Sequence, residues 1–495
     1  MTGPMTAGRA SDPKARCFDL IVADRGHEAI PLLRAWLRQA PQDAVAWQLL
    51  GNACRQEQDG EGAWQAFDRM VALRPADPKA MLGLATTALD SGRPAARLFG
   101  QLVARGQGTA DILLSAVTAL TAEGEVAVAE QLLERALGER PDWVDGHDAL
   151  VSLRWRYGDP ARLDASFAVA TQRVAAPALW SAWIRTLSQA ERYDAAAQVL
   201  GQARALLGDR LEFDAAEASM AMRAGDHRRA DALFHATSGL NDIGTTIAHI
   251  RHAIRTGQLD RAQALIDPML AGPGASMVWP YQSILWRLRG DDRAAWLDGD
   301  PPFHRTAPLG LAKGELAAVA DLLRAREAQR RYPLGQSPRG GTQTEGELFL
   351  HHAPAIRRLR GAVVQAVRDY ARDLPQDATH PFLGTPRTDI RFSGSWSITL
   401  RGGGYHTCHT HPKGWMSGVL YLAVPSRGEL GEETNGALEL GRPPEDLETG
   451  LSRYTHVAPQ EGRVVLFPST MWHSTIPFET GTRLTVAFDV MTPRF

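Results

Sequence analysis

The sequence predicts a multidomain α + β protein, in which an all-α solenoid comes first and an antiparallel sandwich or jelly roll with flanking helices follows. Three observations predict this order. A helical motif recurs about every 34 residues in the first half of the chain. From residue 388 onwards, apolar residues instead fall on every second position. A chain of 495 residues is also too long for one ordinary hydrophobic core, so more than one domain is expected.

The composition predicts a cytoplasmic protein without a nucleic-acid or membrane partner. The net charge of −2 gives no electrostatic reason to expect either partner. The cysteines Cys17, Cys54 and Cys408 are scattered, so a disulfide framework is not expected and a reducing cytoplasm fits. No apolar run is long enough for a signal peptide or a membrane span. The oligomeric state stays open.

The first half carries tetratricopeptide-like repeats. Between residues 46 and 75, small residues let two helices approach, large residues fill the space between them, and a proline closes the second helix. The matching positions are Trp47, Leu50, Gly51, Cys54, Ala63, Phe67 and Pro75. Fainter copies follow around Ala196, Ala230 and Ala262.

We therefore expect about seven helical hairpins, stacked as a right-handed solenoid over residues 15–270, after a disordered N-terminus at 1–14. An ordinary helical bundle is the alternative. Such a solenoid holds a peptide or protein in its concave face, or it has an architectural or dimerising role. The sequence does not separate these roles.

The helical pattern changes near residue 271. Residues 271–310 combine glycines and prolines with short helical stretches, so a linker with short helices is expected. We assign 311–495 to the β domain, with flanking helices at 311–330 and 353–374. Between them, "PRGGTQT" (338–344) is too rich in Gly, Pro and Thr for regular structure, which predicts a plain connector or a mobile loop over the site.

Four short segments, separated by turns rich in glycine and proline, predict strands in this domain. They are "SWSITLR", "SGVLYLAV", "RVVLFP" and "RLTVAFDV". In the first, Trp396, Ile398 and Leu400 share one face. The acidic stretch 425–450 is predicted to be a solvated loop, with a substrate lid as the alternative.

Histidines from two distant places suggest a metal site. In "HTH", His409 and His411 lie two residues apart, so on an extended segment both imidazoles point the same way. His473 follows another predicted strand and offers a third ligand. Arg483 lies inside the next strand, where a buried cation is costly unless it meets an anion. Its guanidinium is suited to grip a carboxylate, and the hydroxyl of Thr485 lies on the same face.

Residues of about 300–495 resemble the 2-oxoglutarate/Fe(II) oxygenase domain that follows tetratricopeptide repeats in bacterial proteins, a double-stranded β-helix (jelly roll) of the dioxygenase superfamily. The stretches that carry the resemblance are "GDPPFHR", "QSPRGGTQT", "RFSGSWSITLRGGGYHTCHTHPKGW" and "LFPSTMWHSTIPF…RLTVAFD". The resemblance implies that His409 and His473 bind Fe(II). It also implies that Arg483, assisted by Thr485, binds the distal carboxylate of the co-substrate 2-oxoglutarate, and that dioxygen is the oxidant.

The sequence departs from the family at one ligand. The superfamily usually has H-x-D or H-x-E, whereas His411 stands in the place of the acid. Either three neutral imidazoles bind iron, or His411 lies outside the coordination sphere and water completes it; we favour His411 as a ligand. Glu439 is the only carboxylate of the acidic loop that we consider as a substitute ligand. The weaker candidates for substrate contact are His406, Trp415 and Arg339.

The expected function is that of a 2-oxoglutarate-dependent dioxygenase that hydroxylates a side chain of a protein or peptide bound in the concave face of the solenoid. A small-molecule oxygenase with a scaffolding solenoid is the nearer alternative. A non-catalytic tetratricopeptide module with a degenerate β domain is the other.

Overall fold

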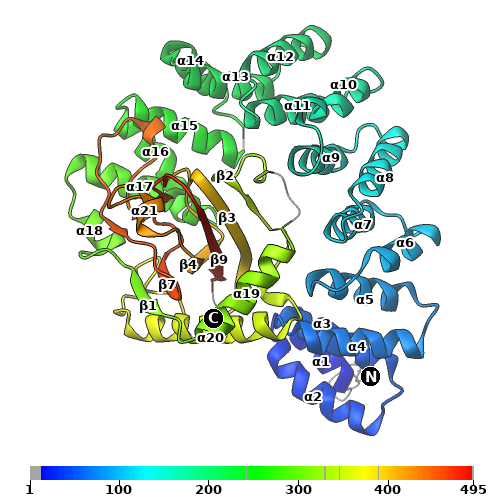
Figure 1. Cartoon of the computed structure of the whole chain (residues 1–495). Coiled ribbons are helices and arrows are strands. Elements are labelled where there is room, and N and C mark those ends of the chain that lie inside the picture. The colour runs from blue at the N-terminus through cyan, green and yellow to red at the C-terminus, as the bar shows by residue number, and fades with distance from the viewer. Residues whose placement is uncertain (1–12, 241, 328–330, 345, 388, 493–495) are drawn as a thin grey trace, which may run out of the picture. The chain divides into compact units, whose positions relative to one another are not determined.

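The computed structural model describes residues 13–240, 242–327, 331–344, 346–387 and 389–492 (Figure 1). The expected disordered segment 1–14 lies outside these residues except for its last two, and helix α1 begins at Pro13. The chain forms two compact units. The first comprises Met1–Leu133 with Glu345–Gly361, and the second comprises Glu134–Thr344 with Ala362–Phe495. The second unit holds every candidate site residue.

Helical hairpins fill the first part of the chain, which confirms the predicted α-solenoid. Alanines at the predicted small positions, such as Ala63 and Ala230, are fully buried where consecutive helices pack. The helices up to the unit boundary are α1 (Pro13–Val22), α2 (Gly26–Gln39), α3 (Ala44–Gln56), α4 (Gly60–Leu73), α5 (Pro78–Asp90), α6 (Ala96–Ala104), α7 (Ala110–Ala122) and α8 (Val126–Glu139).

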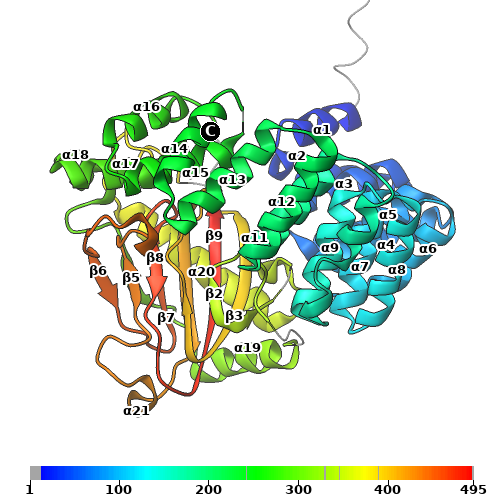
Figure 2. The ribbon, with the colours of Figure 1, turned by 90° about the horizontal axis from the view of Figure 1, so that it is seen from above.

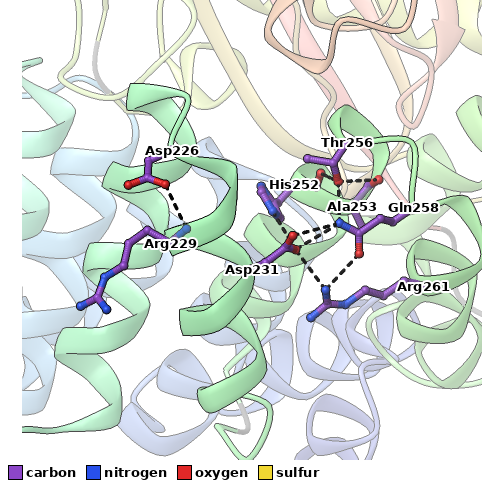
Figure 3. A network of polar contacts seen from close by, with 8 residues as sticks. All are labelled: Asp226, Arg229, Asp231, His252, Ala253, Thr256, Gln258 and Arg261. Carbon is purple, nitrogen blue, oxygen red and sulfur yellow. Dashed lines mark hydrogen bonds and ion pairs between the residues drawn. The ribbon is translucent and has the colours of Figure 1, made fainter.

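The hairpins continue in the second unit. The helices are α9 (Val144–Arg156), α10 (Ala165–Thr171), α11 (Pro177–Gln189), α12 (Tyr193–Leu207), α13 (Leu211–Ala224), α14 (His227–Ala236), α15 (Ile243–Arg255), α16 (Leu259–Leu270), α17 (Ala275–Arg289) and α18 (Arg293–Asp298), with the short 3₁₀ helix η1 (Pro160–Arg162). A polar network joins α14, α15 and α16, because the carboxylate of Asp231 accepts hydrogen bonds from Gln258 and Arg261 and contacts His252 (Figure 3). No helix among the described residues is long and apolar enough to cross a membrane.

The sequence predicts a linker with short helices at 271–310, and helix α17 occupies Ala275–Arg289 of it. Its side chains from Val278 to Trp286 are almost all buried, and Pro280 lies inside it. A helix that is buried on every side shows no polar face, so the three- and four-residue period that identifies the earlier helices is missing here.

Two antiparallel sheets form the β domain, which confirms the predicted jelly roll. The larger sheet has the order β1-β7-β4-β9-β3-β2, and the smaller has the order β6-β5-β8. The strands are β1 (Arg305–Pro308), β2 (Pro338–Gln343), β3 (Phe392–His406), β4 (Gly414–Ala423), β5 (Leu438–Leu440), β6 (Thr455–Val457), β7 (Arg463–Pro468), β8 (His473–Thr475) and β9 (Thr482–Met491). The accompanying helices are α19 (Lys313–Ala325), η2 (Leu348–Leu350), α20 (Pro354–Asp373), α21 (Arg427–Leu430) and η3 (Glu445–Leu447).

The register of the larger sheet decides which side chains face the interior. Arg483 of β9 lies opposite Leu400 of β3, and Thr485 lies opposite Ile398. Directly opposed residues share a face, so Arg483 and Thr485 lie on the predicted apolar face of β3. Tyr421 of β4 faces the same interior, opposite Thr485. Apolar side chains of both sheets fill the space between them: Val419, Val465 and Phe467 from the larger sheet, and Leu438 and Leu440 from the smaller.

Two predictions about loops are wrong. Residues 338–343 form strand β2, which pairs with β3 and has a bulge between Arg339 and Gly341. Glycine allows this pairing, because Gly340 has a φ of +69° and a side chain on Gly341 would strike the carbonyl oxygen of Thr399. The acidic stretch 425–450 is not simply solvated, since it contains α21 and the buried strand β5. Three residues are too few for a sequence period to reveal a strand.

Candidate metal centre

The backbone brings the distant histidines together. The amide of His409 donates to the carbonyl oxygen of His473 at 3.0 Å, and the amide of His473 donates back to His409 at 3.1 Å. The amide of His411 donates to the carbonyl oxygen of Ser469 at 2.8 Å. The loop after β3 is therefore fixed along the segment that leads into β8.

The three imidazoles converge and leave one nitrogen each for a metal. The ring centres of His409 and His473 lie 4.2 Å apart, and His411 lies 4.9 and 5.0 Å from them. The Nδ1 atoms of His409 and His473 lie 2.8 and 3.0 Å from the carbonyl oxygens of Thr407 and Met471. A carbonyl only accepts, so each Nδ1 carries the proton and each Nε2 keeps a lone pair, which in His409 lies 3.2 Å from the Ser337 hydroxyl.

His411 follows the same rule with a carboxylate. Its Nδ1 lies 2.6 Å from Oδ1 and 2.8 Å from Oδ2 of Asp489. Metal-binding histidines almost always donate their other ring N–H to a carbonyl or carboxylate in this way. One ligand atom from each of the three histidines lies within 4.8 Å of the others, and no other such group of His, Cys, Asp or Glu occurs in the described part of the chain.

Burial keeps the imidazoles of His409 and His473 neutral. It lowers the pKa of His409 to about 3, and it lowers the pKa of His473 well below its ordinary value, with a further contribution from the neighbouring histidines. Neutral imidazole is the form that binds a metal ion, and imidazole is a suitable ligand for Fe(II).

The same burial predicts acid sensitivity of the metal-free protein. Between pH 6.5 and pH 3 the unfolded chain binds a proton at His409 and the folded chain does not, so stability is lost as the pH falls below 6.5. At pH 5 the burial of neutral His409 should lower the free energy of unfolding by about 2 kcal/mol. Urea unfolding at pH 7 and pH 5 should show a smaller loss for His409→Gln than for wild type. The exposed His27→Gln is the control, and equal losses in all three proteins would contradict the assignment.

Arg483 is a buried cation that lacks an anion. Its side chain is 3% exposed, and its Nε and Nη1 atoms have no hydrogen-bond partner among the described residues. The guanidinium lies over the ring of Tyr421, 4.9 Å from its centre. Burial lowers the pKa of Arg483, and Tyr421 partly offsets this. An uncompensated buried charge is costly, so the geometry fits a carboxylate that enters with a ligand, as 2-oxoglutarate would.

The sequence analysis missed Asp489 and Ser337. Asp489 lies on the Arg483 face of β9, and the one available signal was an acid inside the apolar strand "RLTVAFDV". The hydroxyl of Ser337 lies 3.1 Å from Nδ1 of His406 and 3.2 Å from Nε2 of His409. His406 therefore lies beside the three converging histidines, with a serine between it and His409.

Trp415 and Arg339, two of the weaker candidates for substrate contact, form hydrogen bonds within the protein. Nε1 of Trp415 donates to the carbonyl oxygen of Phe382 at 2.9 Å, and the side chain is buried. Nη1 of Arg339 donates to the carbonyl oxygens of Gln336 and Pro338, and Nη2 lies 3.6 Å from Glu191.

Glu439 and Cys408 both lie apart from the three converging histidines. Glu439 lies opposite Ser474 rather than His473, and its carboxylate accepts hydrogen bonds from Arg453 at 2.8 Å and Ser474 at 3.0 Å. The thiol of Cys408 donates to the carbonyl oxygen of Arg442, and burial raises its pKa to about 12.

Comparison with known proteins agrees with this geometry. Residues 394–489 match the family model described as "Putative 2OG-Fe(II) oxygenase". No curated protein sequence matches the chain. The predicted resemblance is thus confirmed: residues 394–489 are similar to a 2-oxoglutarate/Fe(II) oxygenase family, and tetratricopeptide-like helical hairpins precede them.

Solved structures share parts of the chain. A Pseudomonas putida prolyl-4-hydroxylase is 17% identical and covers 42% of this chain and 100% of its own, with a TM-score of 0.29. A tetratricopeptide repeat protein from Parabacteroides merdae is 13% identical and covers 47% and 93%, with a TM-score of 0.30. MamA from Desulfovibrio magneticus is 18% identical and covers 34% and 95%, with a TM-score of 0.30. These scores are too low to carry a conclusion.

Proposed function

We propose that this protein is an Fe(II)- and 2-oxoglutarate-dependent dioxygenase. The observation that carries the proposal is the convergence of three histidines in the same sheet interior that buries the guanidinium of Arg483, which has no anionic partner among the described residues. A degenerate domain without a ligand has no reason to keep such a costly buried charge.

Each side chain has a role in this proposal. His409, His473 and His411 hold the metal ion through Nε2, and their Nδ1 partners fix the rings. Arg483, assisted by Thr485, anchors the distal carboxylate of 2-oxoglutarate. The apolar side chains between the sheets keep water out of this interior. Fe(II), when bound with 2-oxoglutarate, supplies dioxygen activation coupled to decarboxylation, which yields succinate and an oxidised substrate.

We propose a protein or peptide side chain as the substrate, because helical repeats bind extended chains. The test compares cell extract incubated with wild-type protein and with a His473→Ala variant. Proteins that remain bound are digested and searched by mass spectrometry. A peptide that gains one oxygen atom only with wild type and 2-oxoglutarate supports the proposal. A gain on small molecules alone would move the substrate to the second candidate.

The second candidate is a small-molecule oxygenase with a scaffolding solenoid, and contacts within the second unit favour it. Arg251 of α15 binds Asp446 at 2.8 and 2.6 Å, and Arg255 binds Glu448 at 2.6 Å. Arg287 of α17 donates to the carbonyl oxygens of Gly441 and Ser452. Helices α15 and α17 thus lie against the loop 441–454, as Figure 2 shows from above. These helix ends hold the oxygenase domain itself and are not free for a partner.

The hydrogen bonds from Arg287 to the loop 441–454 allow a testable prediction. Arg287→Ala removes two hydrogen bonds to backbone carbonyls, so the loop 441–454 should open more readily by about 1–3 kcal/mol. Hydrogen exchange of peptides from this loop should then be about 10-fold faster or more. Arg289→Ala is the matched control, because Arg289 lies on the same helix and binds Asp260 instead. Equal exchange in both variants would show that Arg287 does not hold the loop.

A further inference from the structure

Strand β9 carries a second charged group on the face that holds Arg483. Asp489 is 9% exposed, and its position opposite Gly394 and Ser417 places it in the interior near His411. The family-model match ends at this residue. The usual H-x-D motif puts a carboxylate on the metal, whereas this chain has His411 there with Asp489 directly behind it.

The contacts of Asp489 are specific. Both carboxylate oxygens of Asp489 contact Nδ1 of His411. Oδ1 also accepts a hydrogen bond from the Ser417 hydroxyl at 2.6 Å. The Ser417 hydroxyl in turn lies 2.9 Å from the Ser469 hydroxyl, which donates to it. Ser469 also accepts from the backbone amide of His411 at 2.8 Å. The ring and the backbone of His411 are therefore held by one connected network.

The network requires a glycine at the start of β4. A side chain on Gly414 would place its Cβ 2.5 Å from the Ser469 hydroxyl and 3.2 Å from Cβ of Asp489. Gly414 therefore allows β4 and β9 to approach closely enough for Asp489 to reach the imidazole.

Asp489 has no permanent counter-ion. No lysine or arginine among the described residues forms an ion pair with it, and His411 is its only ionisable partner. Glu439, which is as deeply buried, has such a partner in Arg453, whereas the equally buried Asp298 accepts hydrogen bonds from the hydroxyls of Ser283 and Tyr454. A metal ion on the far side of that imidazole would supply the positive charge that a buried carboxylate needs.

We propose that Asp489 is a positioning residue that fixes His411 as the third metal ligand. In the H-x-D motif the acid binds the metal directly, whereas here the negative charge of Asp489 lies behind the imidazole. The inference rests on the proposed function, because it assumes that the three histidines hold a divalent ion. It favours His411 as a ligand, which is the choice that the sequence left open.

The test measures Co(II) binding to metal-free full-length protein by calorimetry and by the visible absorption of the bound ion. Asp489→Asn keeps the shape, removes the charge and should weaken Co(II) binding about 10–100-fold. Glu439→Gln, which alters a buried acid outside the network, should bind as wild type does. In a His411→Ala background, Asp489→Asn should have no further effect, because Asp489 acts through that ring.

Each outcome of these measurements supports or overturns the inference. Ser417→Ala, which removes one donor to Asp489, should also weaken binding and shift the absorption, so the result does not depend on one variant folding. If Asp489→Asn binds like wild type, or weakens binding equally without His411, the inference is overturned while the proposed function stands. If wild-type protein binds no Co(II), both are overturned.

Discussion

Replacing His473 with alanine should abolish 2-oxoglutarate-dependent succinate release and weaken Co(II) binding by about 100-fold or more. His473 supplies one of three converging imidazoles, and the two that remain would leave the metal ion with one protein ligand fewer. The measurements are succinate formation with Fe(II) and ascorbate, and Co(II) calorimetry on the metal-free protein.

The matched control is His456→Ala. His456 is an exposed histidine on β6 in the same small sheet, and it should leave both quantities unchanged. This prediction also decides against the non-catalytic alternative. Wild-type protein that forms no metal-dependent succinate, or a His473→Ala variant that forms as much as wild type, would favour a solenoid stabilised by an inactive β domain.

Replacing Arg483 with alanine should raise the 2-oxoglutarate concentration required for half-maximal turnover by about 100-fold and leave Co(II) affinity intact. Two charge-assisted hydrogen bonds are worth about 1.5–3 kcal/mol each, and part of this is retained by Thr485 and solvent. Arg483→Lys keeps the charge and loses the two parallel hydrogen bonds, so it should fall between wild type and alanine.

Stability distinguishes a binding role from a structural role of Arg483. The guanidinium is buried without an anion, so Arg483→Met should not destabilise the protein measured without 2-oxoglutarate. Added 2-oxoglutarate should raise the melting temperature of wild type and not of this variant. Unchanged co-substrate dependence in the alanine variant would remove Arg483 from its assigned role.

The parts of the fold that repeat a period could be predicted from the sequence. Helical hairpins follow from small residues such as Ala63 and Ala230 at regular spacing, because these positions must be small for two helices to pack. The central strands follow from the two-residue period, which also places Arg483 on the correct face. Strand β2 and the full length of helix α17 could not be predicted this way, because one is a glycine-rich strand with a bulge and the other is buried on almost all sides between Val278 and Trp286.

The site was predictable only where chemistry and spacing coincide. His409 and His411 point together because they lie two residues apart, and the bridge to His473 completes the group. Asp489 and Ser337 contact these histidines across segments that are far apart in the chain, and one sequence does not reveal such contacts.

A crystal structure of the protein grown without oxygen, with Fe(II) and 2-oxoglutarate, tests the central claim most directly through anomalous scattering at the iron edge. The account predicts one iron peak within bonding distance of Nε2 of His409, His411 and His473, and a 2-oxoglutarate carboxylate on the guanidinium of Arg483. An iron peak elsewhere, or a guanidinium that contacts no ligand while 2-oxoglutarate is bound, would contradict it.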